Sequence, residues 1–157
     1  LFRQRVTAIK KQMPHACVAA DVIAGFPGES DEEFAQTFNF IKSLPISYLH
    51  VFPYSDRPLA KASKYPDHVH PHIIRQRVNQ LLELGTNKQQ TFFEENVGSV
   101  RPLLAEGTRK NGLRFGFTDN YIKCAVDETI MKENEIRLIR LSEIVQNKEF
   151  VYCRFPN

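Results

Sequence analysis

Two apolar runs separated by one capped helix constrain the fold of this chain more than any other feature. The first run covers residues 17–24 (CVAADVIA) and the second covers residues 48–54 (YLHVFPY). Between them, Ser30 and Glu33 have the spacing of a capping box, in which each side chain accepts a hydrogen bond from the other residue's backbone amide. A strand, a capped helix and a second strand in direct succession predict a βαβ unit with a parallel pair of strands.

Helices are expected on both sides of this unit. Residues 2–13 repeat apolar side chains at helical spacing, and the helix after Ser30 does the same as far as Leu44. A third, long helix begins at His72, and the residues expected to face inward are Ile74, Val78, Leu81 and Leu82. Because both apolar runs are nearly continuous, we expect the two strands to be covered on both faces.

After Gly98 the pattern changes to short strands separated by turns. The runs with strand character are 100–106, 113–117, 121–126, 135–141 and 150–155. Several short strands in succession are typical of a small antiparallel barrel. The sequence therefore predicts an α/β domain at residues 1–97 and an all-β domain at residues 98–157.

Composition excludes some classes of protein and leaves others open. A net charge of +3 permits a nucleic-acid partner without arguing for one. The cysteines, at positions 17, 124 and 153, have no paired spacing, which favours free thiols in a reducing compartment, the cytoplasm. No apolar stretch approaches the roughly 20 residues of a membrane span. The chain starts at Leu1 inside a helix-like segment, so we expect a piece of a longer protein.

Residues 25–28 (GFPG) follow directly on the first apolar run. Parallel α/β folds bind ligands at the carboxyl ends of their strands, and glycines let a ligand approach the backbone closely. The segment is neither a P-loop, since no Lys-Ser/Thr pair follows it, nor a GxGxxG turn. Two interpretations stay open at this point, a nucleotide-binding turn and a plain bend between a strand and a helix.

Two further polar clusters have both a functional and a structural interpretation. Tyr54 and Arg57 follow the second strand and could line a polar pocket, or they could belong to the core and to the surface. His68, His70 and His72 alternate along one segment, as metal ligands can, but that segment is expected to be exposed. We therefore predict solvated imidazoles and no metal site.

The predicted barrel carries cations interleaved with aromatic residues. The cations are Arg109, Lys110, Arg114 and Lys123, and the rings are Phe115, Phe117 and Tyr121. Small β-barrels hold single-stranded RNA with this combination, because cations follow the phosphates and rings stack on the bases. Acidic residues such as Asp119 lie among them, so a purely structural barrel stays an alternative.

Three motifs occur in order along the chain: DVIAGFPGE at residues 21–29, LHVFPYSDRP at 49–58 and GFTDNYIK at 116–123. Together they resemble the radical S-adenosylmethionine tRNA methylthiotransferases. The first motif is similar to a turn in the later half of that family's radical-SAM barrel, and the second resembles the next strand and loop. Leu59 and Ala60 stand where the family has Gly-Thr. The third is similar to the G-x-T-x-N-Y core of the family's RNA-holding TRAM domain.

The resemblance implies a fold and a reaction. The fold is the last two strand–helix units of a radical-SAM barrel, a partial TIM-like barrel, followed by a five-stranded antiparallel TRAM barrel. The reaction adds a methylthio group to a modified adenosine beside the tRNA anticodon, with S-adenosylmethionine and [4Fe–4S] clusters as cofactors. The sequence LHVFPYS is most similar to the threonylcarbamoyladenosine branch. Enzymes acting on isopentenyladenosine or on a ribosomal-protein aspartate, and a non-catalytic RNA-binding module, are the alternatives.

The resemblance also implies roles for individual residues. Those on the side of S-adenosylmethionine are Ile23, Gly25, Phe26, Pro27, Gly28, Phe52, Pro53 and Tyr54. Those on the side of RNA are Arg57, Arg114, Phe117, Tyr121 and Lys123. Asn120 is expected to form a turn instead, since asparagine tolerates the left-handed conformation.

The family's cluster-binding CxxxCxxC motif does not occur in this sequence. We therefore assign none of the cysteines as a metal ligand and no residue as catalytic. The chain alone is expected to be inactive and to need the amino-terminal half of the same protein as its partner. Without that half, exposed strand edges and apolar faces predict self-association.

Overall fold

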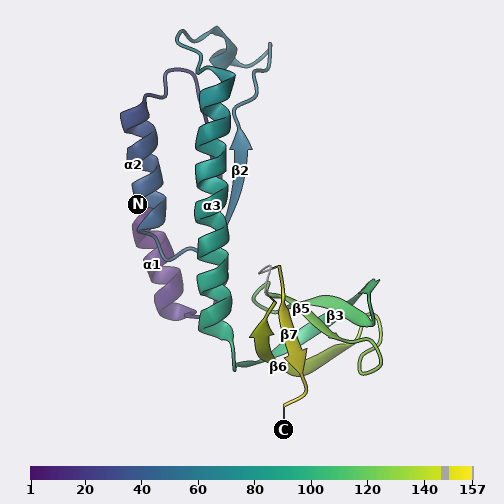
Figure 1. Ribbon diagram of the computed structural model, residues 1–157. Coiled ribbons are helices and arrows are strands. Elements are labelled where there is room, and N and C mark those ends of the chain that lie inside the picture. Colours follow the sequence, from purple (N-terminus) through teal and green to yellow (C-terminus); the bar gives the residue numbers. More distant parts are fainter. Residues whose placement is uncertain (146–148, 157) are drawn as a thin grey trace. The chain divides into compact units, whose positions relative to one another are not determined.

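A computed structural model describes residues 1–145 and 149–156 of the chain (Figure 1). Contacts divide the chain into two compact units. The first comprises Leu1–Pro14 and Val18–Gln89, and the second comprises His15–Cys17 and the residues from Gln90 onward. The division falls inside one long helix, so the domain assignment 1–97 and 98–157 stays a prediction. Residues 146–148 and 157 of the second predicted domain lie outside the described residues.

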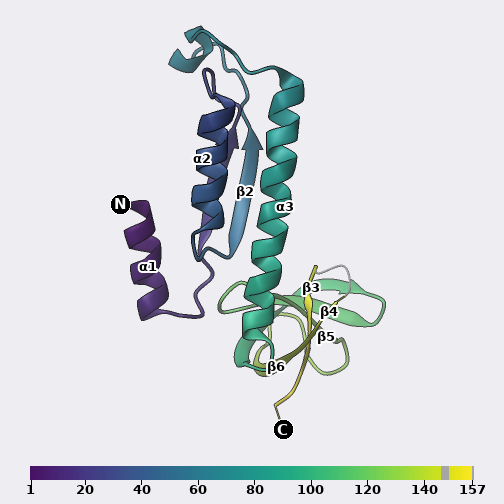
Figure 2. The same ribbon diagram turned by 60° about the vertical axis from the view of Figure 1, so that its left-hand side comes forward.

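The first unit contains the predicted βαβ arrangement. Its elements are α1 (Phe2–Gln12), β1 (Ala19–Ala24), α2 (Asp31–Lys42), β2 (Tyr48–Pro53), the 3-10 helix η1 (Lys61–Lys64) and most of α3 (Pro71–Asn96). Strands β1 and β2 pair in parallel, from Ala19 with Tyr48 to Ala24 with Pro53, as predicted. Helices α2 and α3 run along the strands (Figure 2).

Helix α2 begins with the predicted capping box. The Ser30 Oγ accepts a hydrogen bond from the Glu33 amide at 3.1 Å, and the Glu33 carboxylate accepts one from the Ser30 amide at 2.9 Å. Phe34 and Ile41 are buried on the side that packs in the core. A cap of this kind is worth about 1 kcal/mol, and it determines where the chain leaves the turn after β1.

The two strands are covered on one face only. Ala24 of β1 is 1% exposed and Leu49 of β2 is 5% exposed, and both pack with residues of α2 and α3 in one apolar core. On the opposite face, Ile23 is 57% exposed and Phe52 is 49% exposed. The prediction that both faces are covered is therefore wrong for this unit. Successive side chains of a strand point to opposite faces, and the described residues place helices against only one of them.

Helix α3 turns a narrow stripe toward the same core. Leu81 is fully buried, whereas Leu82, which was predicted to face inward, is 49% exposed. Inward positions follow spacings of three and four residues, so the position that continues from Leu81 is Gly85 and not Leu82. A Cβ at Gly85 would lie 3.3 Å from the Cβ of Leu49, so the helix and the strand approach each other closely there.

Helix α1 is mostly exposed. Of its predicted apolar face only Val6 is buried, at 3% exposure, while Phe2 and Ile9 are exposed.

None of the helices in the described parts of the chain combines the length and the apolar character that crossing a bilayer requires.

The second unit contains a closed five-stranded barrel. Its strands are β3 (Val100–Lys110), β4 (Leu113–Thr118), β5 (Lys123–Asp127), β6 (Ile136–Ile144) and β7 (Val151–Arg154), in the spatial order β3-β4-β5-β7-β6. All the predicted strands are present, but the prediction of an antiparallel sheet is wrong. Strands β5 and β7 pair in parallel through Cys124 with Val151 and Ala125 with Tyr152. A closed ring with an odd number of strands cannot alternate in direction throughout, so one neighbouring pair must be parallel.

The barrel is filled by side chains from β3, β5, β6 and β7 and from the end of α3. The fully buried residues include Phe93, Leu103, Ile122, Cys124, Ile139, Leu141 and Val151. At Gly116, β4 lies so close to β3 that an added Cβ would overlap the carbonyl oxygen of Leu104. The barrel therefore has its own core and leaves no space at this glycine.

Candidate functional sites

The turn after β1 requires glycine at two positions. Gly25 has φ +83° and Gly28 has φ +85°, a region that residues with a Cβ rarely adopt. The amide of Gly28 donates to the carbonyl of Asp67 at 2.9 Å, and the amide of Tyr54 donates to the carbonyl of Ala24 at 2.8 Å. These bonds tie the turn to the end of β2 and to the loop after it.

One carboxylate holds this turn from inside. The amide of Gly25 donates to Glu29 Oε2 at 2.7 Å, and the same oxygen accepts from the Arg77 guanidinium at 2.7 Å. Both glycine amides of the turn are already bonded and Pro27 has no N–H, so few backbone donors remain to cradle a phosphate. The structure therefore disfavours a phosphate site at residues 25–28.

Arg77 is a buried residue that sequence reasoning missed. Its residue exposure is 4%, and its guanidinium also bonds to Asp31 Oδ1 at 2.7 Å and to the carbonyl of Glu29 at 3.0 Å. Burial lowers the pKa of Arg77, but the hydrogen bonds and charges of Asp31 and Glu29 more than offset this, so the pKa lies above its ordinary value. The sequence did contain one indication of this role, because Arg77 directly precedes Val78, which was predicted to face the core.

The predicted cofactor residues meet at the carboxyl ends of the two strands. Ile23 and Phe52 are register partners on the exposed face, and Pro53 pairs with Ala24. The Phe26 ring, 43% exposed, contacts the Tyr54 ring edge to face at a centroid distance of 5.4 Å. Of the predicted set, Pro27 is buried within the turn. Exposed apolar side chains and the turn thus form one continuous wall.

The loop after β2 carries the predicted rim residue. Arg57 is exposed, and its carbonyl accepts a hydrogen bond from the amide of Ala60 at 2.8 Å. Tyr65, which sequence reasoning did not single out, places its ring 6.0 Å from the ring of Phe26. Arg57 therefore belongs to an exposed loop beside the wall, with its side chain available to a ligand in solution.

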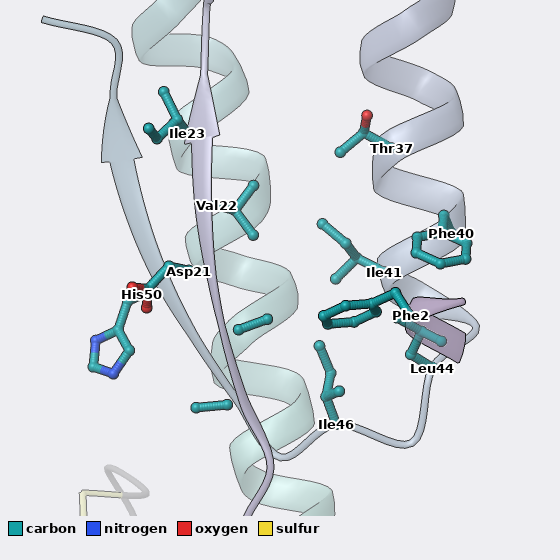
Figure 3. Close-up of a pocket in the computed structure, with 12 residues that line it drawn as sticks. Phe2, Asp21, Val22, Ile23, Thr37, Phe40, Ile41, Leu44, Ile46 and His50 are labelled. Carbon is teal, nitrogen blue, oxygen red and sulfur yellow. The ribbon is translucent and has the colours of Figure 1, made fainter. Parts of the chain in front are cut away.

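An apolar groove of about 710 Å³ lies beside β1 (Figure 3). Phe2 of α1 extends into it toward Ile41 of α2, and Leu44 and Ile46 line its lower part. Within the described residues β1 pairs with β2 alone, so the groove follows an open strand edge. An open edge with an apolar border is a place where further chain can pair.

Metal ligands do not gather in the described residues. No group of three or more His, Cys, Asp or Glu there could hold an ion, and His68, His70 and His72 are exposed. Cys124 is fully buried, and a hydrogen bond with Cys153 together with burial raises the pKa of its thiol well above the ordinary value. Because a cluster ligand must be a thiolate, the buried Cys124 does not fit an iron–sulfur cluster, and the described residues bring no set of three possible ligands together.

In the barrel, the GFTDNY motif forms a buried polar network. The Thr118 hydroxyl donates to Asn120 Oδ1 at 2.7 Å, and it accepts from the amide of Ile122 at 2.9 Å. The Asn120 amide donates to the carbonyl of His15 at 2.9 Å and to Asn96 Oδ1 at 3.1 Å. Asn120 is 6% exposed, so it holds three segments of the second unit together.

The left-handed residue of this turn is Tyr121 and not Asn120. Asn120 lies in a turn, as predicted, but the residue with the left-handed conformation is Tyr121, at φ +61°. The network explains the difference, because Asn120 must point its amide into the core and the next residue then reverses the chain. A bulky residue at positive φ is uncommon and strained. Tyr121 is 76% exposed, which directs its ring into solvent.

Arg114 has a structural environment. It is 5% exposed, its Nε donates to the carbonyl of Met131 at 3.0 Å, and a terminal nitrogen donates to the carbonyl of Glu106 at 3.1 Å. These bonds join the guanidinium to the backbone of two other segments of the second unit. We therefore leave Arg114 out of the proposed RNA surface, although the sequence placed it there.

The remaining predicted RNA residues of the barrel share one region of its surface. Phe117 is 36% exposed, and its ring centroid lies 6.3 Å from that of Tyr121. Lys123 is the register partner of Phe117, and its Nζ lies 5.5 Å from the centroid of the Phe115 ring. Two exposed rings beside a cation make a surface suited to stacking on unpaired bases.

Curated relatives of one kind are similar to this chain. The threonylcarbamoyladenosine tRNA methylthiotransferase MtaB of Aquifex aeolicus is 43% identical over 122 residues, covering 77% of this chain and 28% of that protein. MtaB of Bacillus subtilis is 32% identical over 157 residues, covering 96% and 35%. A tRNA-2-methylthio-N(6)-dimethylallyladenosine synthase of Pelotomaculum thermopropionicum is 33% identical over 112 residues, covering 71% and 25%.

The similarity to these proteins extends over both units, since the match with the Bacillus protein covers 96% of this chain. The chain spans about a third or less of the length of these relatives. No family model matches it. On the strength of the relatives, and in agreement with its three sequence motifs, the chain belongs to the tRNA methylthiotransferase family.

Proposed function

We propose that this chain is the carboxyl-terminal part of an enzyme that adds a methylthio group to threonylcarbamoyladenosine beside the tRNA anticodon. The observation that carries the substrate assignment is the similarity to two relatives named for this reaction, at 43% and 32% identity. Relatives named for dimethylallyladenosine support the same reaction on the other nucleoside, which is the second candidate.

The first unit supplies one wall of an S-adenosylmethionine site. Bound S-adenosylmethionine, with an iron–sulfur cluster, supplies the radical that opens an adenosine C–H bond. Ile23 and Phe52 offer apolar surface to an adenine ring, and the exposed Gly28, which has open space where a Cβ would lie, keeps the approach free of side chains. The cluster would be held by residues outside this sequence, because the described residues bring no set of three possible ligands together. The open edge and groove beside β1 support a radical-SAM barrel continued by further strands.

The second unit holds the tRNA as a TRAM domain. Phe117 and Tyr121 would stack on unpaired bases, and Lys123 would follow the phosphates. Arg57, on the loop at the rim of the first unit, would contact the RNA near the reacting nucleoside. In this proposal the first unit contributes to the reaction site and the second unit binds the tRNA.

Nucleoside analysis tests the substrate. The full-length protein is expressed in a bacterial strain that lacks threonylcarbamoyladenosine methylthiotransferase, and in a second strain that lacks the isopentenyladenosine enzyme. We expect the methylthio derivative of threonylcarbamoyladenosine to return in the first strain only. Return in the second strain only would transfer the assignment to the alternative nucleoside. Return in neither would leave a protein substrate or a non-catalytic RNA-binding module.

Salt-dependent binding tests the RNA surface. In the full-length protein, Lys123→Glu should weaken tRNA binding and lower the slope of log K against log salt by about 1, since one phosphate contact is lost. Tyr121→Ala should weaken binding about tenfold with an unchanged slope, because stacking is not ionic. Lys132→Glu, an exposed cation outside the ring pair, is the matched control. Equal effects of Lys123→Glu and Lys132→Glu would remove Lys123 from the interface.

A further inference from the structure

We propose that Arg77 is a positioning residue for the cofactor site, although it touches no part of the wall that faces the ligand. Arg77 acts through Glu29, and Glu29 acts on the amide of Gly25. The inference rests on the proposed function, because it assumes that the turn at residues 25–28 borders S-adenosylmethionine.

The contacts form a short chain from helix to turn. The Arg77 guanidinium donates to Glu29 Oε2 at 2.7 Å, and this oxygen accepts from the Gly25 amide at 2.7 Å. A second guanidinium nitrogen donates to Asp31 Oδ1 at 2.7 Å. Asp31 is the first residue of α2, so one planar cation fixes the carboxylate in the turn relative to the helix that follows it.

Helix α3 controls the turn at two points, one helical turn apart. Ile74 packs so closely on Gly25 that a Cβ there would overlap its side chain, and Arg77 is three residues further on the same face. Both contacts come from the covered side of the sheet. The exposed side, where Ile23 and Phe52 lie, stays free for a ligand.

The geometry has a cost that packing alone does not require. Arg77 is a buried cation, and ion pairs with Glu29 and Asp31, both at 2.7 Å, offset its desolvation. An apolar side chain could join α2 and α3 as well. The guanidinium instead holds the Glu29 carboxylate, which accepts the hydrogen bond of the Gly25 amide. This arrangement keeps the backbone of the turn in one conformation, as a preorganised binding wall requires.

Cofactor affinity and tRNA affinity, measured together, separate positioning from a merely structural role. In the reconstituted full-length protein, Arg77→Met keeps the length of the side chain and removes the charge. The dissociation constant of S-adenosylmethionine, measured by equilibrium dialysis, should rise about tenfold, since the Glu29 carboxylate loses its partner. Arg77→Lys should restore part of this affinity. Arg75→Met, an exposed arginine on the same helix, is the matched control and should change neither constant.

Hydrogen exchange supplies a readout that does not need the cofactor. Exchange of a peptide covering residues 22–30 should accelerate in Arg77→Met and not in Arg75→Met, while tRNA affinity stays within about twofold of wild type in both. Glu29→Gln, which keeps an acceptor and removes the charge, gives the same result if Arg77→Met fails to fold.

Two outcomes overturn the inference in different ways. Wild-type affinity for S-adenosylmethionine in folded Arg77→Met would show that Arg77 only joins the helices, and the proposed function would stand. Parallel losses of cofactor and tRNA affinity would also assign Arg77 a merely structural role, because a general loosening of the fold moves both. No binding of S-adenosylmethionine by the wild-type protein would overturn the proposed function, and the role of Arg77 with it.

Discussion

The two units of this chain solve the problem of strand edges in opposite ways. The barrel closes on itself, and each of its five strands has two neighbours. In the first unit, β1 and β2 have only each other among the described residues, and Ile23 and Phe52 on their uncovered face are about half exposed. In the described residues, the strands of one unit form a closed ring, and those of the other keep an edge and a face available.

The difference suggests that the two units contribute differently to the stability of the fold and to ligand binding. A closed barrel with a buried core can be held by its own contacts, whereas a two-stranded sheet is marginal and depends on the helices packed against it. The proposed cofactor wall lies on the incomplete unit, where surface is available. The proposed RNA residues Phe117, Tyr121 and Lys123 lie on the outside of the complete one, where a rigid barrel presents them.

The largest effect is expected from a substitution that pushes two strands of the barrel apart. Gly116→Ala should lower the free energy of unfolding by about 3 kcal/mol, because the new Cβ overlaps the carbonyl of Leu104 in the neighbouring strand. The measurement is thermal unfolding followed by circular dichroism. In the control Gly107→Ala the nearest atoms belong to the flexible carboxylate of Glu133, at 3.0 Å, so a much smaller loss is expected. Equal losses would contradict the close packing at Gly116.

A smaller loss is expected when the polar network is cut. Asn120→Ala removes the donor to His15 and Asn96 and the acceptor for Thr118, which should cost about 2 kcal/mol because these groups are buried. Urea unfolding gives the value. Asn79→Ala, at an exposed position of α3, should leave stability nearly unchanged. A cost no larger than that of Asn79→Ala would mean that water replaces the network easily.

Hydrogen exchange sharpens the comparison without a substitution. Peptides covering β1 and β2 should exchange at least about tenfold faster than peptides covering β4 and β5, because the open sheet unfolds locally at lower free energy. Mass spectrometry at two protein concentrations separates this from self-association, which would protect the open edge only at the higher one. Equal protection of both units at low concentration would be inconsistent with an open edge.

The smallest effect concerns the turn after β5. Hydrogen bonds from Thr129 lower the pKa of Asp127 below its ordinary value, so the carboxylate stabilises the fold above the pKa of the unfolded chain, and the contribution is lost as the pH falls through the folded pKa. Asp127→Asn should therefore lower the melting temperature slightly at pH about 6, and no longer once the pH lies below the folded pKa of Asp127. If the melting temperatures of Asp127→Asn and wild type still differed in acid, the effect would come from the shape of the side chain and not from its charge.

Local rules predicted much of this fold. The capping box at Ser30 and Glu33 and the parallel pairing of the two apolar runs follow from spacing alone, and the structure has both. The strands of the barrel were also predicted, because alternation and turn residues are local signals. The parallel β5–β7 pair was missed, since it depends on how many strands close the ring.

Long-range partners could not be predicted. Nothing beside Arg77 in the sequence identifies Glu29 and Asp31, which lie more than 40 residues away, as its partners. Arg114 and Lys123 look alike in the sequence, but one binds buried carbonyls and the other lies beside exposed rings. The apolar run at residues 17–24 predicted two covered faces, but an apolar composition does not tell which neighbouring elements the described residues supply.

Tyr121 has a consequence for how this surface can evolve. A tyrosine at φ +61° is less stable than a glycine would be, and its exposed ring recovers little of that in packing. In a library selected for folding alone, glycine or asparagine should displace tyrosine at position 121. In a library selected for tRNA binding, tyrosine should persist. The position would then distinguish the two kinds of selection by itself, because the substitution that the fold favours is the one that the ring-dependent function opposes.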